Sequence, residues 1–311
     1  MATTPKPWTT FHQQIEILTS RGLSDAAEYA QYLRSVGYYR LSGYWYPLRQ
    51  FANQNHALTH RRSDLFVPGA KMHHVIELYE FDEKLRSAVW QALCKFEIAL
   101  RVDVGHVFGE TDPYLHMHIL EIQNNDRDRN KARNFAVTLA ETQKRSREAF
   151  VKHHQDAYNG QMPIWVITEI LQFGSLISLY LLAPFKLQVQ VANLYSTRVD
   201  TLGSWLRVMN SLRNICAHHA RLWNRKMAVT PATNLRNSCG KLKSCLGRPE
   251  KLFTSLSIAV YLLECKGFVE EIRAIARVLT EFPTGIPGCS ISDIGAPSDW
   301  RSTPLWAPYC A

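Results

Sequence analysis

Apolar residues recur every three or four positions along a stretch that runs from Met72 to about Phe108. The stripe consists of Leu78, Leu85, Val89, Leu93, Phe96 and Leu100. This spacing places all six side chains on one face of an α-helix, whereas a strand would require strict alternation of apolar and polar residues. The stretch therefore predicts one long amphipathic helix.

Most of the remaining chain has the same helical character. Further helices are predicted over 11–22, 25–37, 121–152, 163–182, 202–225 and 252–282, the last as one or two helices, with an irregular loop over 53–63. No run of alternating strands, no G-x-G-x-x-G, no Walker loop and no internal repeat occurs in the sequence. The fold class predicted is all-α.

The sequence divides into three regions. Residues 1–70 form a helical region with an aromatic box at 37–46, which has five aromatic residues in ten. We interpret the box as a helix–turn packed against a core, and the alternative is a stacking platform for unpaired bases. Residues 71–282 form the helical domain. Residues 283–311 hold five of the fourteen prolines and predict an extended arm laid over that domain.

The predicted location is the cytoplasm. The stretch 164–183 is strongly apolar, but Glu169 at its middle would be costly in lipid, so we expect a buried helix and no membrane contact. The seven cysteines are scattered without a C-x-x-C pair, and no signal peptide is recognised at 1–8. We therefore expect free thiols, no metal site and no cofactor. A zinc site that includes Cys239 and Cys245 is the alternative, although their spacing does not match the common zinc motifs.

The positive charge is confined to one segment. The chain has 36 basic and 27 acidic residues, a net charge of +9. Residues 201–249 contain no acidic residue and nine basic ones: Arg207, Arg213, Arg221, Arg225, Lys226, Arg236, Lys241, Lys243 and Arg248. A confined basic block favours a phosphate-binding face, and the alternative is a solvated basic surface.

Within this block, residues 213–225 read R-N-I-C-A-H-H-A-R-L-W-N-R. On a helix, with about 100° per residue, the polar side chains fall on one face and the apolar ones on the other. The polar face holds Asn210, Arg213, Asn214, Ala217, His218 and Arg221, and the apolar face holds Trp205, Val208, Met209, Leu212, Ile215, Cys216, His219 and Leu222. We therefore predict that His219 packs in the core and that His218 lies beside Arg213 on the polar face.

An arginine and a histidine on one face suit RNA cleavage. Arginine binds phosphate and offsets developing charge, and histidine moves protons near neutral pH. RNA supplies its own nucleophile, the 2′-hydroxyl, so no metal is required. A metal-dependent nuclease would need clustered carboxylates, and this region has none, although other segments could donate Glu97 or Asp103. Because one Arg and one His make a small site, we expect a homodimer with a composite cleft.

The stretch Arg213–His218 matches the R-x4-H motif of the HEPN superfamily of RNases. Together with Gly37–Trp45, Tyr79–Arg86, Glu97–Arg101 and Ile294–Trp306, it makes nearly the whole chain resemble the bacterial abortive-infection Abi family, of the AbiD/AbiF-like type. The resemblance implies a HEPN-type helical bundle, dimerisation across the motif helix and a role in phage defence. It also implies metal-independent cleavage of single-stranded RNA that leaves a 2′,3′-cyclic phosphate and a 5′-hydroxyl.

By motif position, the resemblance assigns Arg213 and His218 as the catalytic pair and Asn214 as a supporting residue. It assigns Glu97 and Arg101 to a neighbouring helix, where they orient the site. RNA contacts are expected from the basic block, through Arg207, Arg221, Arg225 and Lys226, whereas contact by residues 236–251 stays undecided. A non-coding RNA is a further expected partner or regulator.

Two other functions compete with the RNase. A non-catalytic RNA-binding or sensing protein of a defence system would use the same basic block to tether RNA. A DNA-binding regulator is disfavoured, because no helix-turn-helix spacing is found and the polar face of 202–225 is short for reading a groove.

Overall fold

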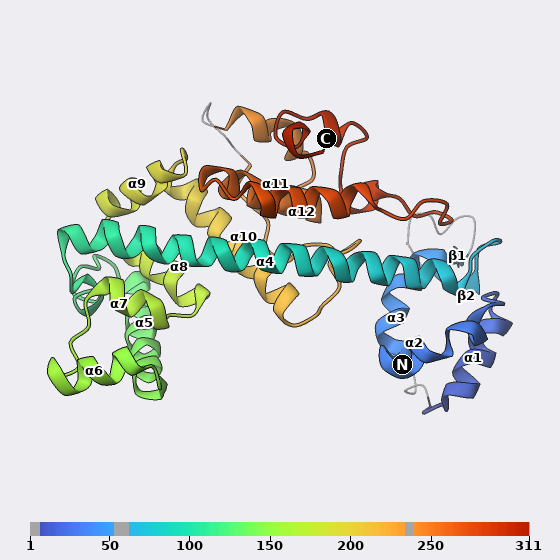
Figure 1. Ribbon diagram of the computed structural model, residues 1–311, viewed down its shortest axis with the longest axis horizontal. Helices are drawn as coiled ribbons and strands as arrows, with labels where there is room; N and C mark the ends of the chain where they lie inside the picture. Colours follow the sequence, from blue (N-terminus) through green and yellow to red (C-terminus); the bar gives the residue numbers. More distant parts are fainter. Residues whose placement is uncertain (1–6, 53–61, 234–238, 311) are drawn as a thin grey trace.

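The computed structural model describes residues 7–52, 62–233 and 239–310. Its central element is α4 (Met72–Thr111), a helix of 40 residues that is about 60 Å long. The stripe predicted from the sequence, from Leu78 to Leu100, is buried along its length. Figure 1 shows the other helices arranged along α4. The protein is mostly helical, so the all-α prediction is confirmed.

The remaining helices and strands are mostly short. The α-helices are α1 (Phe11–Ser20), α2 (Ala30–Ser35), α3 (Tyr38–Trp45), α5 (Asp126–Arg145), α6 (Ala149–Ala157), α7 (Ile164–Ile170), α8 (Phe173–Leu182), α9 (Phe185–Leu194), α10 (Val199–Ala217), α11 (Leu252–Cys265) and α12 (Val269–Thr280). A small antiparallel sheet pairs β1 (Arg49–Phe51) with β2 (Arg62–Phe66). Part of the predicted loop, residues 53–61, lies outside the described residues, and its last two residues begin β2.

Two lobes lie at opposite ends of α4 on the same side of it (Figure 1). Helices α1 to α3 form one lobe, and α5 to α8 form the other. Helices α11 and α12 lie along the opposite side of α4, and α10 packs against α4, α8 and α11 between the lobes. The segment that contains the R-x4-H motif is thereby placed at the centre of the molecule.

The aromatic box forms α3. Gly37, which precedes it, has a φ of 92°, a left-handed conformation that favours glycine. Tyr44 and Trp45 are buried, whereas Tyr39 is 92% exposed. The helix therefore packs against a core through one face, as the interpretation of a packed helix–turn requires.

The apolar stretch 164–183 is not one helix. It breaks into α7 and α8 at Leu171 and Gln172, both of which have extended backbone angles. The break leaves Glu169 and Gln172 exposed while Leu171 and Phe173 stay buried. Among the helices that the structure describes, none has the length and apolar character that crossing a bilayer requires.

The C-terminal region is compact rather than extended. It forms three short 3-10 turns at Ile291–Ile294, Trp300–Ser302 and Ala307–Tyr309. Trp300 and Trp306 are buried against Phe253 of α11, and Trp306 stacks on that ring at 5.5 Å between centroids. The Trp306 Nε1–H also donates to Ser257 Oγ at 3.0 Å. Burial of the two indoles explains why the prolines do not produce an extended arm.

The tail therefore contributes to stability. Trp306→Ala removes a fully buried indole, and we expect it to lower the free energy of unfolding by about 3–5 kcal/mol, measured by chemical denaturation. Tyr39→Ala, at an exposed aromatic residue of α3, is the control and leaves the denaturation midpoint nearly unchanged. Equal stability of the Trp306 variant and the control would show that the tail is not part of the core.

Candidate functional site

The motif helix ends earlier than its sequence pattern predicts. Helix α10 stops at Ala217 and His218 is its C-cap, so the prediction of one helix through Arg225 is wrong. Beyond the cap, His219 N–H donates to Cys216 O and Ala220 N–H donates to Ile215 O, both at 3.0 Å. His219 has a φ of 52°. This bond pattern with a left-handed residue is a Schellman motif, which satisfies the last carbonyls of the helix.

Termination at this point changes the position of both histidines. His219 was predicted to pack in the core, but it is exposed, because the chain has left the helix and no longer follows its apolar face. The His219 carbonyl accepts a hydrogen bond from Arg40 of α3. His218 is exposed at the end of α10, and its N–H donates to Asn214 O at 3.0 Å.

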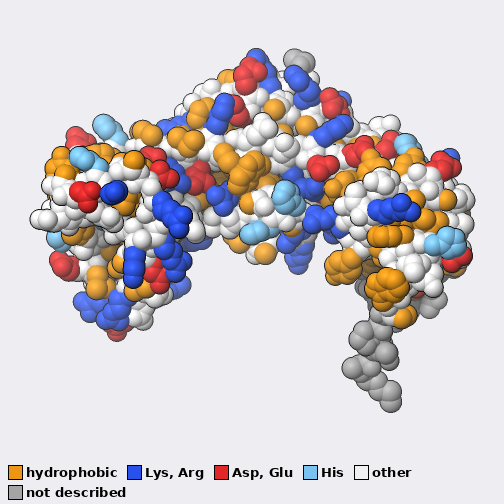
Figure 2. Space-filling view, turned by 60° about the horizontal axis from the view of Figure 1, so that its bottom comes forward, with side chains coloured by type: hydrophobic (Ala, Val, Ile, Leu, Met, Phe, Trp, Pro, Cys, Tyr) orange, Lys and Arg blue, Asp and Glu red, His pale blue; other side chains and the backbone are white. Residues whose placement is uncertain are grey.

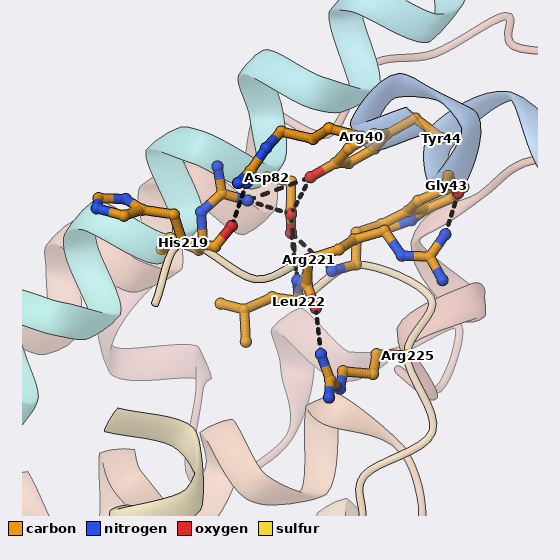
Figure 3. Close-up of polar contacts among 10 residues, drawn as sticks. Arg40, Gly43, Tyr44, Asp82, His219, Arg221, Leu222 and Arg225 are labelled. Atoms are coloured by element: carbon orange, nitrogen blue, oxygen red, sulfur yellow. Dashed lines mark hydrogen bonds and ion pairs between the residues drawn. The ribbon is translucent and has the colours of Figure 1, made fainter. Parts of the chain in front are cut away.

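A buried carboxylate holds the chain that follows the motif. Asp82 of α4 is fully buried and accepts hydrogen bonds from the backbone N–H groups of Leu222 and Trp223, the latter at 2.6 Å (Figure 3). The same carboxylate accepts a hydrogen bond from the Tyr44 hydroxyl at 2.7 Å and forms an ion pair with Arg86. Asp82 thus joins α3, α4 and the segment after α10.

Hydrogen-bond donors surround the Asp82 carboxylate. Burial raises the pKa of Asp82, and Arg86, the Tyr44 hydroxyl and the backbone N–H donors oppose that shift. Burial beside this charge also raises the pKa of Tyr44, so its hydroxyl remains a donor. Each of these groups donates a hydrogen bond to the carboxylate. Removing one partner of such a buried, fully paired group strongly lowers the free energy of unfolding.

Arg221 makes a second contact between the same segments. Its guanidinium donates to the Gly43 carbonyl of α3 (Figure 3). A Cβ at Gly43 would lie 3.3 Å from Arg221 Nη1, a tight contact that the guanidinium would have to shift slightly to accommodate. Burial lowers the pKa of Arg221. Its side chain, expected to contact RNA, is therefore directed at α3, and Arg225 Nη1 lies 3.5 Å from the Arg221 carbonyl.

Arg213 is directed at α4. Its Nε lies 3.5 Å from Glu97 Oε2 and its guanidinium lies over the Trp90 ring, 5.2 Å from the centroid. Nε is shielded from solvent and makes no hydrogen bond, but Nη1 lies 3.4 Å from Asn214 Oδ1. Three residues of the predicted site, Arg213, Glu97 and Asn214, therefore meet here. The Arg213 side chain is 30% exposed.

Glu97 connects Arg213 to the next element. It pairs with Arg101 at 2.6 Å, and Arg101 donates to the Thr168 carbonyl of α7. Glu97 is buried, and its carboxylate has both Arg101 and Arg213 within ion-pair distance. The structure thus brings Glu97, Arg101, Arg213 and Asn214 together, and His218 lies one turn beyond Asn214 at the end of α10.

The other predicted RNA contacts lie outside this cluster. Arg207 is exposed two turns earlier on α10, and Lys226 is exposed on the segment after it. Arg236 lies outside the described residues. Figure 2 shows Lys, Arg and His side chains gathering in the hollow between the two lobes. In the described part of the chain, no three His, Cys, Asp or Glu side chains gather as metal ligands would.

Asp82 is the residue that the sequence reasoning missed. It lies four residues after Leu78 and three before Leu85, so a carboxylate interrupts the apolar stripe of α4. An ionisable residue on a buried face requires a partner, and this signal was available from the sequence.

We expect Asp82→Asn to lower the free energy of unfolding by about 3–5 kcal/mol, because the buried Arg86 loses its counter-charge. Hydrogen exchange at the Leu222 and Trp223 amides should become faster. Glu83→Gln, at the exposed neighbouring position of α4, is the matched control. Unchanged exchange in the Asp82 variant would contradict the role assigned to this carboxylate.

Comparison with known proteins identifies a family for this chain. The sequence model of the Abi-like protein family matches residues 31–224, more than half of the chain, from α2 to the segment that Asp82 holds. No curated protein and no solved structure matches the chain. The family connects the chain with abortive infection, a form of phage defence. On this match, the chain belongs to the Abi-like protein family.

Proposed function

We propose that the protein is a metal-independent endoribonuclease of abortive infection that cleaves single-stranded RNA in the cytoplasm. The observation that carries the proposal is the exposed His218 at the end of α10, close in the chain to an arginine that Glu97 and Trp90 hold. The basic hollow between the lobes supports it, because a polyanion would be attracted there (Figure 2).

In the proposed reaction, the ribose 2′-oxygen attacks the adjacent phosphorus and the bond from phosphorus to the 5′-oxygen breaks. His218 moves a proton, removing it from the 2′-hydroxyl or delivering it to the 5′-oxygen. Arg213 offsets the charge that develops on the phosphoryl oxygens. The products are a 2′,3′-cyclic phosphate and a 5′-hydroxyl.

The neighbouring residues position the pair. The Glu97–Arg101 pair and the Trp90 ring restrict the guanidinium of Arg213, and Asn214 contacts its Nη1. The C-cap places His218 on the same face as Asn214, since residues four apart are neighbours on a helix. In this proposal the fold is a HEPN-type bundle, and a non-coding RNA is a candidate regulator.

A homodimer completes the site. The reaction has a proton transfer on each side of the phosphorus, and a two-fold axis doubles the groups available for them. An exposed apolar pair on α4 offers a surface for it: Ile98 and Val102 are each 61% exposed, and each adjoins a member of the Glu97–Arg101 pair in the sequence. The dimer would bury these side chains beside the site.

We expect purified protein to cleave single-stranded RNA in the presence of EDTA, with His218→Ala about 10²–10⁴-fold slower and Arg213→Ala about 10²–10³-fold slower. The rate at which labelled RNA is converted to shorter products measures both effects. His219→Asn is the matched control, because it alters the adjacent exposed imidazole and asparagine tolerates the left-handed conformation.

Equal cleavage by His218→Ala and His219→Asn would contradict the assignment, and a strict metal requirement would contradict the mechanism. Intact RNA after long incubation, with binding that weakens steeply as salt rises, would instead support the alternative of a non-catalytic RNA-binding or sensing protein.

The dimer gives a separate prediction. Ile98→Glu should shift the protein from dimer to monomer in sedimentation velocity and reduce cleavage, because a buried carboxylate without a partner is costly. Leu65→Glu is the matched control, on a leucine of β2 that is 52% exposed. A monomeric wild-type protein with full activity would remove the composite site.

A further inference from the structure

A cavity of about 440 Å³ lies between α5, α8 and α10. Its polar lining consists of Lys131, Asn134, Thr138, Ser175, Ser178 and Arg207, and its apolar lining of Phe135, Leu181 and Leu182. No carboxylate is among these lining residues. A cavity with two cations, several hydroxyl and amide groups and an apolar wall matches a phosphate with its attached sugar or base.

The two cations are available to a ligand. Arg207 is exposed, and no carboxylate of the described residues lies within ion-pair distance of it; its Nη1 lies 3.4 Å from the Gly203 carbonyl. Lys131 pairs with Asp128, an exposed contact three residues away on α5 that adds little stability. Lys131 can therefore exchange this contact for a phosphate.

A neighbouring cavity on the same lobe is unsuited to phosphate. It is lined by Arg145 together with Glu141, Glu148 and Glu169, so negative charge exceeds positive charge there. Like charge would repel an RNA backbone from this second cavity. The charge of the lining residues therefore distinguishes the cavity beside α10.

A polar stripe on α10 connects the first cavity with the candidate site. Arg207, Ser211, Asn214 and His218 follow one another at intervals of three or four residues, so they share a face of the helix. The eleven steps from Arg207 to His218 correspond to about 16 Å along the axis. That distance is the length of a short piece of single-stranded RNA.

We propose that this cavity is a second RNA subsite, in which Lys131 and Arg207 bind a backbone phosphate of the strand whose scissile bond lies at His218. The inference rests on the proposed function and adds the path of the substrate: the strand runs along the α10 stripe towards α5 and α8. Phe135, Leu181 and Leu182 provide the apolar wall for a sugar or base.

The test compares a single-stranded RNA of about 16 nucleotides with a dinucleotide, which is too short to reach the cavity. Arg207→Glu should lower the cleavage rate of the long RNA at limiting concentration about tenfold and leave dinucleotide cleavage unchanged. Lys131→Glu should act in the same direction. Binding is measured by fluorescence anisotropy, with both charge reversals made in the His218→Ala variant. Each charge reversal should reduce the slope of the logarithm of the binding constant against the logarithm of salt concentration by about one or more.

Arg277→Glu is the matched control. Arg277 is an exposed arginine of α12 that also lines a cavity, of about 310 Å³, but α12 lies on the other side of α4 (Figure 1). We expect it to change long-RNA binding less than twofold. Equal effects of Arg207→Glu and Arg277→Glu would overturn the subsite, as would a loss that also affects the dinucleotide.

The outcomes separate this inference from the proposed function. If wild-type protein cleaves no RNA but Arg207→Glu alone weakens binding of the long RNA, the subsite stands and the RNase proposal fails. If cleavage occurs and Arg207→Glu behaves like wild type, the RNase proposal stands and the subsite fails. Tighter binding of a free nucleoside monophosphate than of the long RNA, measured by calorimetry, would contradict a strand-binding role.

Discussion

The architecture of the candidate site depends on Asp82. A carboxylate without exposure is tolerated only when partners replace its water, and here a guanidinium, a phenol and two backbone N–H groups do so. The two N–H groups belong to Leu222 and Trp223, four and five residues beyond the end of the motif at His218. One buried carboxyl group in the first third of α4 therefore sets where the chain goes after α10, and with it the surroundings of His218.

The same arrangement explains why α3 belongs with the site. Arg40 donates to the His219 carbonyl, and the Gly43 carbonyl accepts from Arg221 (Figure 3). Tyr44 donates to the carboxylate of Asp82, which holds the segment after α10. Residues of the aromatic box thus support the segment after the motif, through the Arg40 side chain, the Gly43 carbonyl and the Tyr44 hydroxyl. The match to the Abi-like family spans α3, α4 and α10 together, the parts that this support joins.

Sequence patterns predicted the helices better than their ends. The stripe of α4 gave its position because burial repeats with the helical period, and a carboxylate at Asp82 could have signalled the buried network. The end of α10 could not be read in the same way, since the Schellman motif places His219, not glycine, in the left-handed conformation. The contact of Arg213 with Glu97 joins helices far apart in the sequence, and the resemblance to a known family was needed to expect it.

The central claim is that Arg213 and His218 act on a phosphodiester whose own 2′-hydroxyl is the nucleophile. A DNA oligonucleotide with one ribonucleotide tests this most directly, with mass spectrometry of the products. The account predicts a single cut on the 3′ side of the ribonucleotide and a 2′,3′-cyclic phosphate end. Cleavage at deoxynucleotides, or a 5′-phosphate product, would contradict it.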